Sequence, residues 1–476
     1  MINKYIYRNL GVAIIAVSFA ACTPAIVQKV VNKTVPDQYS TAKDTANVAK
    51  LKWKEFFVDP YLQALIDSAL KNNQELNITL QEIEISKSEV RVRKGEYLPF
   101  VDLKAGAGVE KVGRYTHQGV SDATIEYKPG KEMPEPLPDY FIGAFASWEV
   151  DIWRKLRNAK KSSVLKFLST VEGKNFMVTR LISEIANSYY ELITLDNQLA
   201  ILKSNIEIQE KAMKIVQMQK SAAQVTELPV RKFEAEVLKN RGRIYYIEQS
   251  IIETENKINF LVGRYPQHVS RNFQDFNTLI PNAIQKGIPS ELLENRSDIK
   301  QAELDLSAAK LDVKVAKANF YPSLGISAGV GLQAFDASYL VKTPASLLYS
   351  LTGDITAPLI NRNAIKAFYY SANAKQIQAV YNYERTVLNA YIEVANQLSK
   401  IDNLEKSYNL KMKEVEALTK AISISDNLFK SARADYMEVL MTQRDALESK
   451  FELIETKKEQ MSAMVNVYQA LGGGWN

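Results

Sequence analysis

Side chains capable of thiol, imidazole or metal chemistry are scarce in this chain. Its 476 residues include one Cys and two His. The two histidines, His117 and His268, are far apart in the sequence, and neither lies near a nucleophile motif. One Cys cannot supply the thiolate sets of zinc or iron–sulfur sites, nor a disulfide scaffold within one chain. We therefore expect no enzyme activity, no cofactor and no metal site.

The single Cys directly follows a short apolar segment. Lys4 and Arg8 precede Leu10 to Ala21, which is shorter than the roughly 20 residues of a membrane-spanning helix and typical of a signal peptide. Phe19-Ala20-Ala21-Cys22 is similar to the lipobox of bacterial lipoproteins, although Phe19 stands where Leu is usual. We expect a signal peptide at 1–21 and lipidation, with palmitate among the acyl groups, at Cys22. The alternative is general secretory cleavage that leaves Cys22 as a free thiol.

The composition narrows the class of protein. The chain has 60 basic and 54 acidic residues, and a net charge of +6 is too mild to indicate binding to nucleic acid. With 46% hydrophobic and 24% charged residues, it matches neither a disordered chain nor a helical membrane protein. Only 19 Gly and 15 Pro interrupt it, so long uninterrupted elements are expected.

The chain contains an internal tandem duplication. Residues 89–108 align without a gap with residues 312–331, an offset of 223 (312 minus 89). Residues from Asn259 similarly match residues from Tyr468, an offset of 209 (468 minus 259). The first copy is lengthened by a Pro-rich insertion between the two matches.

In both copies a helical pattern changes to a strand pattern at a proline, Pro99 or Pro322, which predicts two helix-to-strand junctions. Return strands are predicted over residues 140–153 and 346–359, and surface loops over 115–140 and 336–345. The four strands alternate apolar and polar residues, and they exceed the usual five or six residues. Their length suits a membrane β-strand, although a soluble sheet with one face on a core is the alternative. Four strands cannot close a barrel, but three copies would supply 12.

Three segments between and after the strands show heptad spacing of apolar residues, which predicts long coiled-coil helices. The first, from about Lys155 to Lys220, would measure roughly 95 Å as a helix. A soluble spectrin-like bundle explains the heptads equally well, but not the strands inserted at equivalent points of both halves. The heptad positions are Leu181, Ile185, Leu192, Leu195, Leu199, Leu202, Ile206, Met213 and Val216; Val387, Tyr391, Val394, Leu398 and Ile401; and Leu447, Phe451, Ile454, Met461, Val465 and Tyr468.

Two longer motifs give the sequence a specific resemblance. The proteins of a known family have a characteristic sequence at the start of each half. Residues 53–76 match the first of these sequences, with Trp53, Phe57 and Asp59-Pro60 in place. Residues 288–303 match the second, with Ser297 where Pro is usual. The chain resembles the bacterial outer membrane efflux proteins of the TolC and OprM type, in their lipoprotein branch, over essentially its whole mature length. The motifs are structural rather than catalytic.

The resemblance implies an α+β membrane protein and a homotrimer. Its 12-stranded outer membrane β-barrel, four strands from each chain, would continue into a long periplasmic α-helical coiled-coil barrel. The trimer would be a passive exit duct for drugs or other small molecules, working with a periplasmic adaptor protein and an inner-membrane pump of the RND type. Outer membrane lipid would surround it, and nucleic acid would not be a partner. A duct for type I protein or peptide secretion, and a soluble coiled-coil scaffold lipoprotein, are the alternatives.

The resemblance also divides the chain. We expect a lipidated N-terminal and equatorial segment at 22–59, a first repeat at 60–262, an equatorial linker at 263–288, a second repeat at 289–470 and a tail at 471–476. Residues 23–59, 264–287 and 472–474 would form a girdle around the middle of the tunnel.

In this family an acidic run where paired helices turn forms the periplasmic gate. The matching stretch here is 432–444, which contains Asp435, Tyr436, Glu438 and Met441. Because Met441 replaces the usual second acid, Glu438 is the best candidate for a ring of carboxylates in the trimer. The alternative is an ordinary solvated Glu438. Ala223 and Ala432 replace the turn glycine in the two copies, which makes the turn geometry less predictable.

Overall fold

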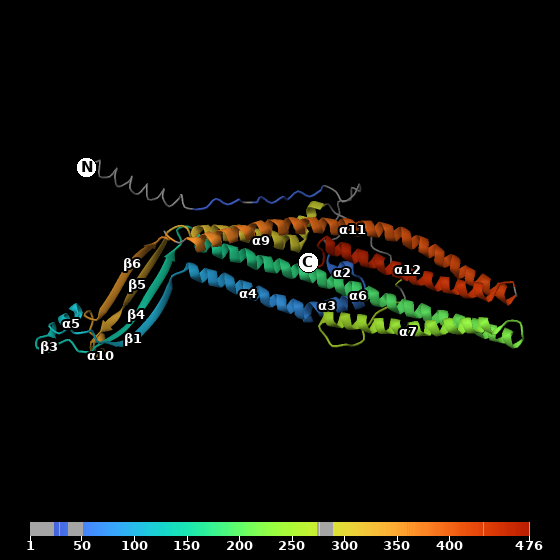
Figure 1. Ribbon diagram of the computed structural model, residues 1–476, viewed down its shortest axis with the longest axis horizontal. Helices are drawn as coiled ribbons and strands as arrows, with labels where there is room; N and C mark the ends of the chain where they lie inside the picture. Colours follow the sequence, from blue (N-terminus) through green and yellow to red (C-terminus); the bar gives the residue numbers. More distant parts are fainter. Residues whose placement is uncertain are drawn as a thin grey trace. The chain divides into compact units, whose positions relative to one another are not determined.

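The computed structural model describes residues 23–27, 29–36, 51–273, 276, 289–358, 360, 362–431 and 433–475. The predicted signal peptide, Cys22 and Ala432 lie outside these residues. The chain forms two compact units (Figure 1). Unit 1 comprises residues 1–30, 84–168 and 304–380, and unit 2 comprises residues 31–83, 169–303 and 381–476.

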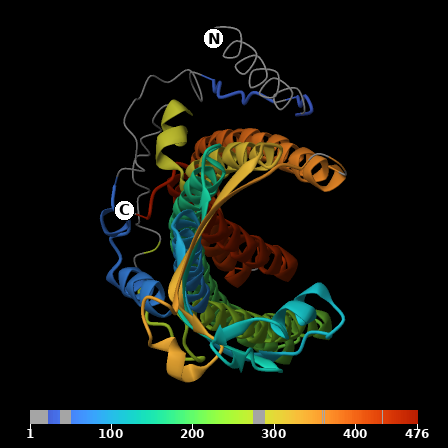
Figure 2. The ribbon, with the colours of Figure 1, turned by 90° about the vertical axis from the view of Figure 1, so that its left-hand side faces the viewer.

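Unit 1 is built around one antiparallel sheet. Its four strands are β1 (Phe100–Glu110), β4 (Leu137–Val150), β5 (Ser323–Ala334) and β6 (Leu347–Thr356), in the order β1-β4-β5-β6. The two predicted hairpins are present, and the pairing of β4 with β5 joins them into one sheet. Figure 2 shows the strands following an arc, as expected from the natural twist of β-sheets.

The two faces of this sheet differ in chemistry. In one transverse row Leu103, Ala144, Val330 and Tyr349 lie opposite one another. This apolar face carries no charged residue in any of the four strands, and its side chains are exposed or half-buried, with Leu103 87% and Leu351 80% accessible. The opposite, polar face carries all the charged residues of the strands: Asp102, Lys104, Glu110, Asp139, Glu149 and Asp354.

The segment predicted as the first surface loop has structure of its own. It contains α5 (His117–Asp122) and a hairpin of β2 (Glu126–Lys128) and β3 (Lys131–Glu132), and β4 begins at Leu137 rather than Tyr140. The Thr116 hydroxyl caps α5 by accepting from the Gly119 amide at 3.1 Å, and Gly130, with φ 76°, closes the hairpin. The second loop contains α10 (Ala337–Leu340). In Figure 1 these pieces gather at the end of the sheet away from its helices.

The helix-to-strand junctions surround the predicted prolines. Helix α4 (Gln74–Tyr97) ends just before Pro99 and α9 (Ser297–Ala318) just before Pro322. A proline lacks an amide hydrogen and restricts the preceding residue to extended conformations, which explains why the helices stop here. On the return, the buried Asp151 carboxylate accepts from the Leu156 and Arg157 amides at 3.0 and 2.9 Å and fixes the start of α6.

The helices reproduce the duplication. Helices α6 (Lys155–Ser221) and α11 (Asn363–Lys430) have 67 and 68 residues, and α7 (Glu227–Val262) and α12 (Tyr436–Ala470) have 36 and 35. Short helices α2 (Trp53–Phe56), α3 (Pro60–Asn72), η3 (Pro289–Glu291) and α8 (Leu292–Asn295) lie in unit 2. No helix among the described residues is both long and apolar enough to cross a bilayer.

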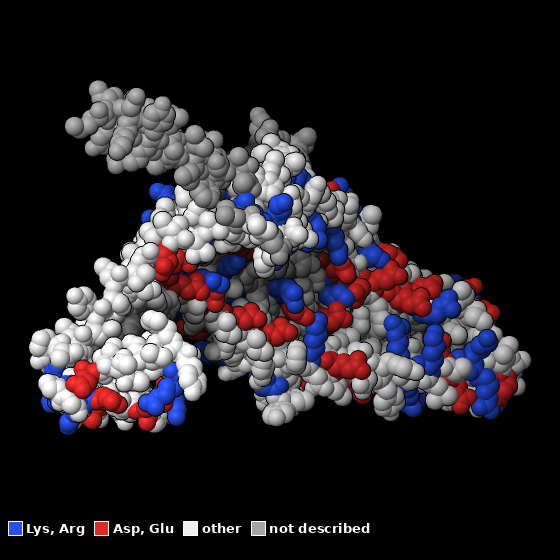
Figure 3. Space-filling view, turned by 60° about the vertical axis from the view of Figure 1, so that its left-hand side comes forward, with Lys and Arg blue, Asp and Glu red and all other residues white. Residues whose placement is uncertain are grey.

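Most of the predicted heptad positions are buried in the core of unit 2. Leu202 on α6 packs in one cluster with Val237 on α7 and Phe451 on α12. Of the three predicted series, the first and third are buried almost throughout, whereas Tyr391, Leu398 and Ile401 of the second are only half-buried. On the face seen in Figure 3, acidic and basic side chains intermingle along these helices, as expected for the solvated side of amphipathic helices.

The expected girdle is only partly described. Within unit 2, Arg271 holds residues 264–273 to the long helices. Its buried guanidinium donates to Asp196 on α6 at 2.5 Å and also pairs with Glu255 on α7. In the first described segment, Ile26 packs in unit 1 against Phe320 and Tyr369. The Asn373 and Gln376 side chains of α11 donate to the Val27 and Lys29 carbonyls at 3.2 and 3.4 Å, so polar contacts and this apolar cluster together hold the extended segment.

Candidate functional site

The polar face of the sheet is the first part of the candidate site. Most of its acids are exposed or bound locally: Asp139 accepts from Gln333 at 2.9 and 3.0 Å, and Glu149 pairs with Lys155 at 2.5 Å. Lys104 is the only basic residue in the four strands. This face is therefore hydrophilic and mainly acidic, whereas the opposite face resembles the lipid-facing side of a membrane strand.

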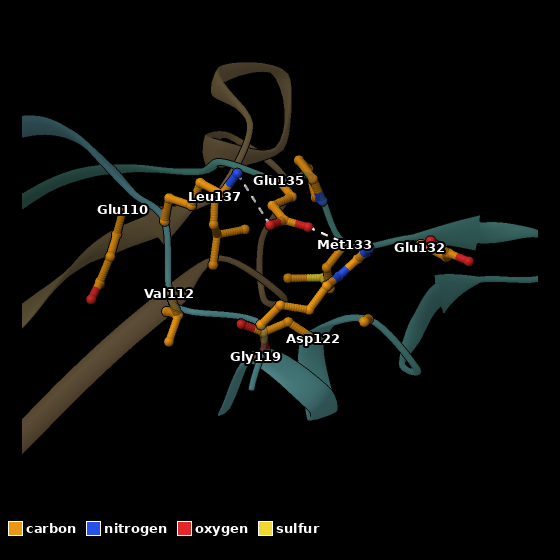
Figure 4. A pocket seen from close by; sticks show the side chains of 12 residues that line it. Glu110, Val112, Gly119, Asp122, Glu132, Met133, Glu135 and Leu137 are labelled. Carbon is orange, nitrogen blue, oxygen red and sulfur yellow. Dashed lines mark ion pairs between the residues drawn. The ribbon is translucent and has the colours of Figure 1, made fainter. Parts of the chain in front are cut away.

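A pocket of about 240 Å³ opens between β1, α5 and β3 at the loop end of unit 1 (Figure 4). Glu135 lies at its centre and forms ion pairs with Lys111 at 3.5 Å and Arg114 at 3.4 Å. All three side chains are largely exposed, so water screens these pairs and they stabilise the loops only slightly. Figure 3 shows charged side chains concentrated over this end of the unit.

The turn between α6 and α7 is the first-copy counterpart of the predicted gate. Ala223 adopts the left-handed conformation, φ 58°, that glycine usually occupies at a helix end. The Gln224 amide donates to the Gln219 carbonyl and the Ala223 amide to the Lys220 carbonyl, both at 2.9 Å. In the second copy the Arg433 amide donates to the Leu428 carbonyl at 2.8 Å, the same five-residue closure. The two turns therefore close with hydrogen bonds of the same spacing, 224 to 219 and 433 to 428.

The candidate gate residues follow the second turn. Asp435 is the N-cap residue of α12 and is exposed, and Glu438 lies exposed in the first helical turn. Met441, one turn later, is 45% accessible. Tyr436 is different, because its ring packs against the cluster of Val216, Phe233 and Val439. Within one chain the structure thus leaves Asp435, Glu438 and Met441 exposed, and it packs the half-buried Tyr436 against the core.

A cavity of about 200 Å³ lies between α6, α11 and α12 near the same turns. Lys211 and Lys430 line it together with Asp426, Phe429 and Val439. Burial raises the pKa of the Asp426 carboxyl, and the charge of Lys430 only partly opposes this shift. Sequence reasoning missed Asp426, because its surroundings come from three helices that only the structure brings together.

The two sequence motifs that open the halves have structural roles. Asp59 caps α3 by accepting from the Tyr61 amide at 2.8 Å, Pro60 occupies the first helical position, and the Tyr189 hydroxyl donates to Asp59 at 2.7 Å. Burial raises the pKa of Tyr189 and keeps this hydroxyl a donor.

Arg296, in the second motif, is buried at the start of α9. It donates to Asp298 at 2.9 and 2.6 Å, to Glu393 of α11 at 2.7 Å and to the Ala470 carbonyl of α12 at 2.9 Å. Beside it, Gly472 has φ 92°, and a Cβ there would lie 2.8 Å from the Asn295 backbone. Close packing against the Asn295 backbone therefore requires glycine at position 472 of the tail.

These observations agree with a sequence comparison. The model of the outer membrane efflux protein family matches residues 65–264 and 288–473, one stretch in each repeat. The chain belongs to the outer membrane efflux protein family. This efflux protein is accordingly a component of the outer membrane, and its family consists of channels.

Relatives match this efflux protein over nearly their full length. The pyoverdine export outer membrane protein OpmQ of Pseudomonas aeruginosa is 26% identical over 473 residues, covering 98% of this chain and 97% of the relative. The cation efflux system protein CusC of Escherichia coli is 24% identical over 466 residues, covering 97% of each.

Solved structures show the same fold. CusC superposes with a TM-score of 0.82 at 22% identity, covering 95% of this efflux protein and all of that chain. The open state of the Neisseria gonorrhoeae MtrE outer membrane channel gives 0.82 at 22%, covering 95% and 98%.

Proposed function

We propose that three copies of this chain form the outer membrane duct of a tripartite efflux system. The duct passes small molecules delivered by a periplasmic adaptor and an inner-membrane RND-type pump. It acts without catalysis, and conduction depends on the wall and on the opening of the tip.

The sheet with two open edges supports this proposal most directly. Among the described strands, β1 and β6 each have a partner on one side only. In lipid an open edge leaves backbone donors and acceptors without partners, at a cost of several kcal/mol for each group. Because β1 runs antiparallel to its neighbours and the strand number is even, β6 of one copy can pair with β1 of the next. Three copies would close a 12-stranded barrel with the apolar face toward lipid.

The helices support a tunnel wall of equal halves. The pairs α6/α7 and α11/α12 have nearly equal lengths, so three chains give six similar helical pairs around one axis. Exposed apolar residues on α7 recur at heptad spacing, Leu238, Tyr245 and Ile252, at 59%, 73% and 52% accessibility. This stripe suits packing against a helix of another copy.

The relatives favour small solutes as cargo. Those most similar here are named for export of pyoverdine, cations, toluene and solvents. None of these names refers to a secreted protein, so we propose small-molecule efflux rather than protein secretion.

Disulfide scanning tests closure of the barrel. In a Cys22→Ser background, Leu103→Cys on β1 is combined in turn with Tyr349→Cys, Leu351→Cys and Ile355→Cys on β6. One combination is expected to give oxidant-dependent covalent trimers, and Ser350→Cys, on the other face, is the matched negative control. Monomers with every pair would contradict the proposed closure.

Deletion tests the transport role. Loss of the gene is expected to increase susceptibility to several dyes, drugs or metal ions, and the wild-type gene should restore resistance. Loss of a secreted protein, with unchanged susceptibility, would instead indicate a secretion duct.

A further inference from the structure

Two large aromatic side chains interrupt the polar face of the sheet. Phe141 and Phe145 on β4 point to the same side as Glu149 and away from the apolar face. Both are only half-buried. Hydrophobic rings on the polar side of a membrane sheet have no lipid to contact, so a different role is required.

Glycines on the neighbouring strands make room for both rings. Gly106 of β1 lies opposite Phe141, and a Cβ there would lie 2.3 Å from ring carbon Cε1. Gly329 of β5 lies opposite Phe145, where a Cβ would lie 2.9 Å from Cδ1. Each ring therefore covers a neighbouring glycine. Both rings rest against the wall and remain partly exposed.

Lys104 adds a positive charge to the second ring. Its ammonium nitrogen lies 5.6 Å from the centre of the Phe145 ring, within the range of a cation–π contact. Its side chain is exposed, and no ion pair with a described carboxylate accompanies this contact. Asp102 lies opposite Phe145 on the same strand as Lys104, so the surroundings disfavour a ligand with several negative charges.

We propose that Phe145 and Lys104, with Phe141 beside them, form a binding site for planar aromatic monoanions on the inner wall of the barrel. The solute's ring stacks on Phe145, and its carboxylate or sulfonate accepts from the Lys104 ammonium. The proposal rests on the proposed function, which makes the polar face the lumen. One stacked ring and one exposed cation give weak, reversible binding, as a conducting pathway requires.

Equilibrium binding of 7-methoxycoumarin-3-carboxylate to the full-length trimer in nanodiscs, followed by fluorescence anisotropy, tests the site. Uncharged 7-methoxycoumarin and the cation 1-methylquinolinium are the comparison probes. Lys104→Met is expected to weaken carboxylate binding about ten-fold, as loss of one charge-assisted contact, while binding of the neutral coumarin stays the same. Phe145→Leu should weaken binding of both coumarins while still covering Gly329.

The matched control is Lys131→Met, a lysine of the loop hairpin, which should leave binding unchanged. Lys104→Arg should retain binding of the carboxylate probe. This variant therefore separates the effect of losing the charge from the effect of disturbing the fold. Unchanged carboxylate binding in Lys104→Met, or tighter binding of 1-methylquinolinium than of the carboxylate by the wild type, would overturn the proposal.

A separate readout distinguishes this inference from the duct itself. The wild-type gene and Lys131→Met should restore resistance to uncharged, non-aromatic substrates in the deletion strain. If they do so while Lys104→Met and Phe145→Leu trimers bind the probe like the wild type, the site is disproved and the duct remains. If the wild-type gene restores no resistance, the duct proposal fails first.

Discussion

Glu438 shows how a single side chain can act through symmetry. In one chain it is an exposed carboxylate in the first turn of α12, where the helix dipole favours a negative charge. Three copies around an axis would place like charges together and attract cations. We propose this ring as the constriction, with Asp435 on its rim and Met441 as its apolar neighbour.

The prediction for Glu438 concerns ion selectivity. Glu438→Ala should weaken the cation preference of single trimers in planar bilayers and their block by multivalent cations, because the ring loses its charge. Glu448→Ala, an exposed acid farther along α12, is the matched control. Unchanged selectivity in an intact Glu438→Ala trimer would place the constriction elsewhere.

Asp426 gives a prediction about pH. Because its folded pKa lies above the ordinary Asp value, the folded state binds the proton more tightly than the unfolded state. Its contribution to stability therefore falls as pH rises through the window from the unfolded pKa up to the folded pKa, and the penalty persists above it. Asp426→Asn should raise the thermal midpoint at neutral pH and show no gain at the acid end of that window. Asp402→Asn, an exposed acid of α11, is the control.

For single residues, the sequence predicts which residue types matter better than it predicts their neighbours in the fold. Cys22, Pro99 and Pro322 could be singled out because adjacent residues define their contexts. Alternation of apolar and polar residues predicts which face of a strand is apolar. It does not distinguish Phe141 and Phe145 from the polar residues that share the opposite face. Their glycine partners, Gly106 and Gly329, come from other strands, and only the strand register reveals them.

The long strands and helices of both repeats could be predicted, since the duplication presents each pattern twice. The small elements α5, β2 and β3 could not, because six or fewer residues show no useful periodicity. The buried hydrogen bonds of Arg296 could not be predicted either, because the partners of this side chain come from three different helices.

Ala223 supplies the prediction for an element. A left-handed residue other than glycine costs roughly 1 kcal/mol, and a β-branched residue costs more. Ala223→Gly should therefore preserve or increase amide-exchange protection of residues 218–224, whereas Ala223→Val should reduce it. Ala222→Val, at a neighbouring position without the positive φ, is the control. Equal protection in Ala223→Gly and Ala223→Val would contradict the strained turn.

For the whole molecule, we propose that Cys22 carries a lipid and that this lipid is a tether of secondary importance. Cys22→Ser should abolish incorporation of labelled palmitate and leave SDS-resistant trimers in the outer membrane fraction, because a closed barrel buries far more apolar surface than one acyl group. Labelled lipid retained in the variant would refute acylation at this residue. Absence of trimers would show that the anchor is needed for assembly.

The open edges of the sheet also set an order of events during biogenesis. Unit 2 has its own apolar clusters and can acquire its helices early, whereas β1 and β6 gain their second partners only when copies meet. A newly secreted chain must therefore travel through the periplasm with unpaired strands and a bare apolar face, the features that promote aggregation. Its yield should depend on holding chaperones and on the rate of trimer encounter, so overproduction should yield aggregates before it yields more channels.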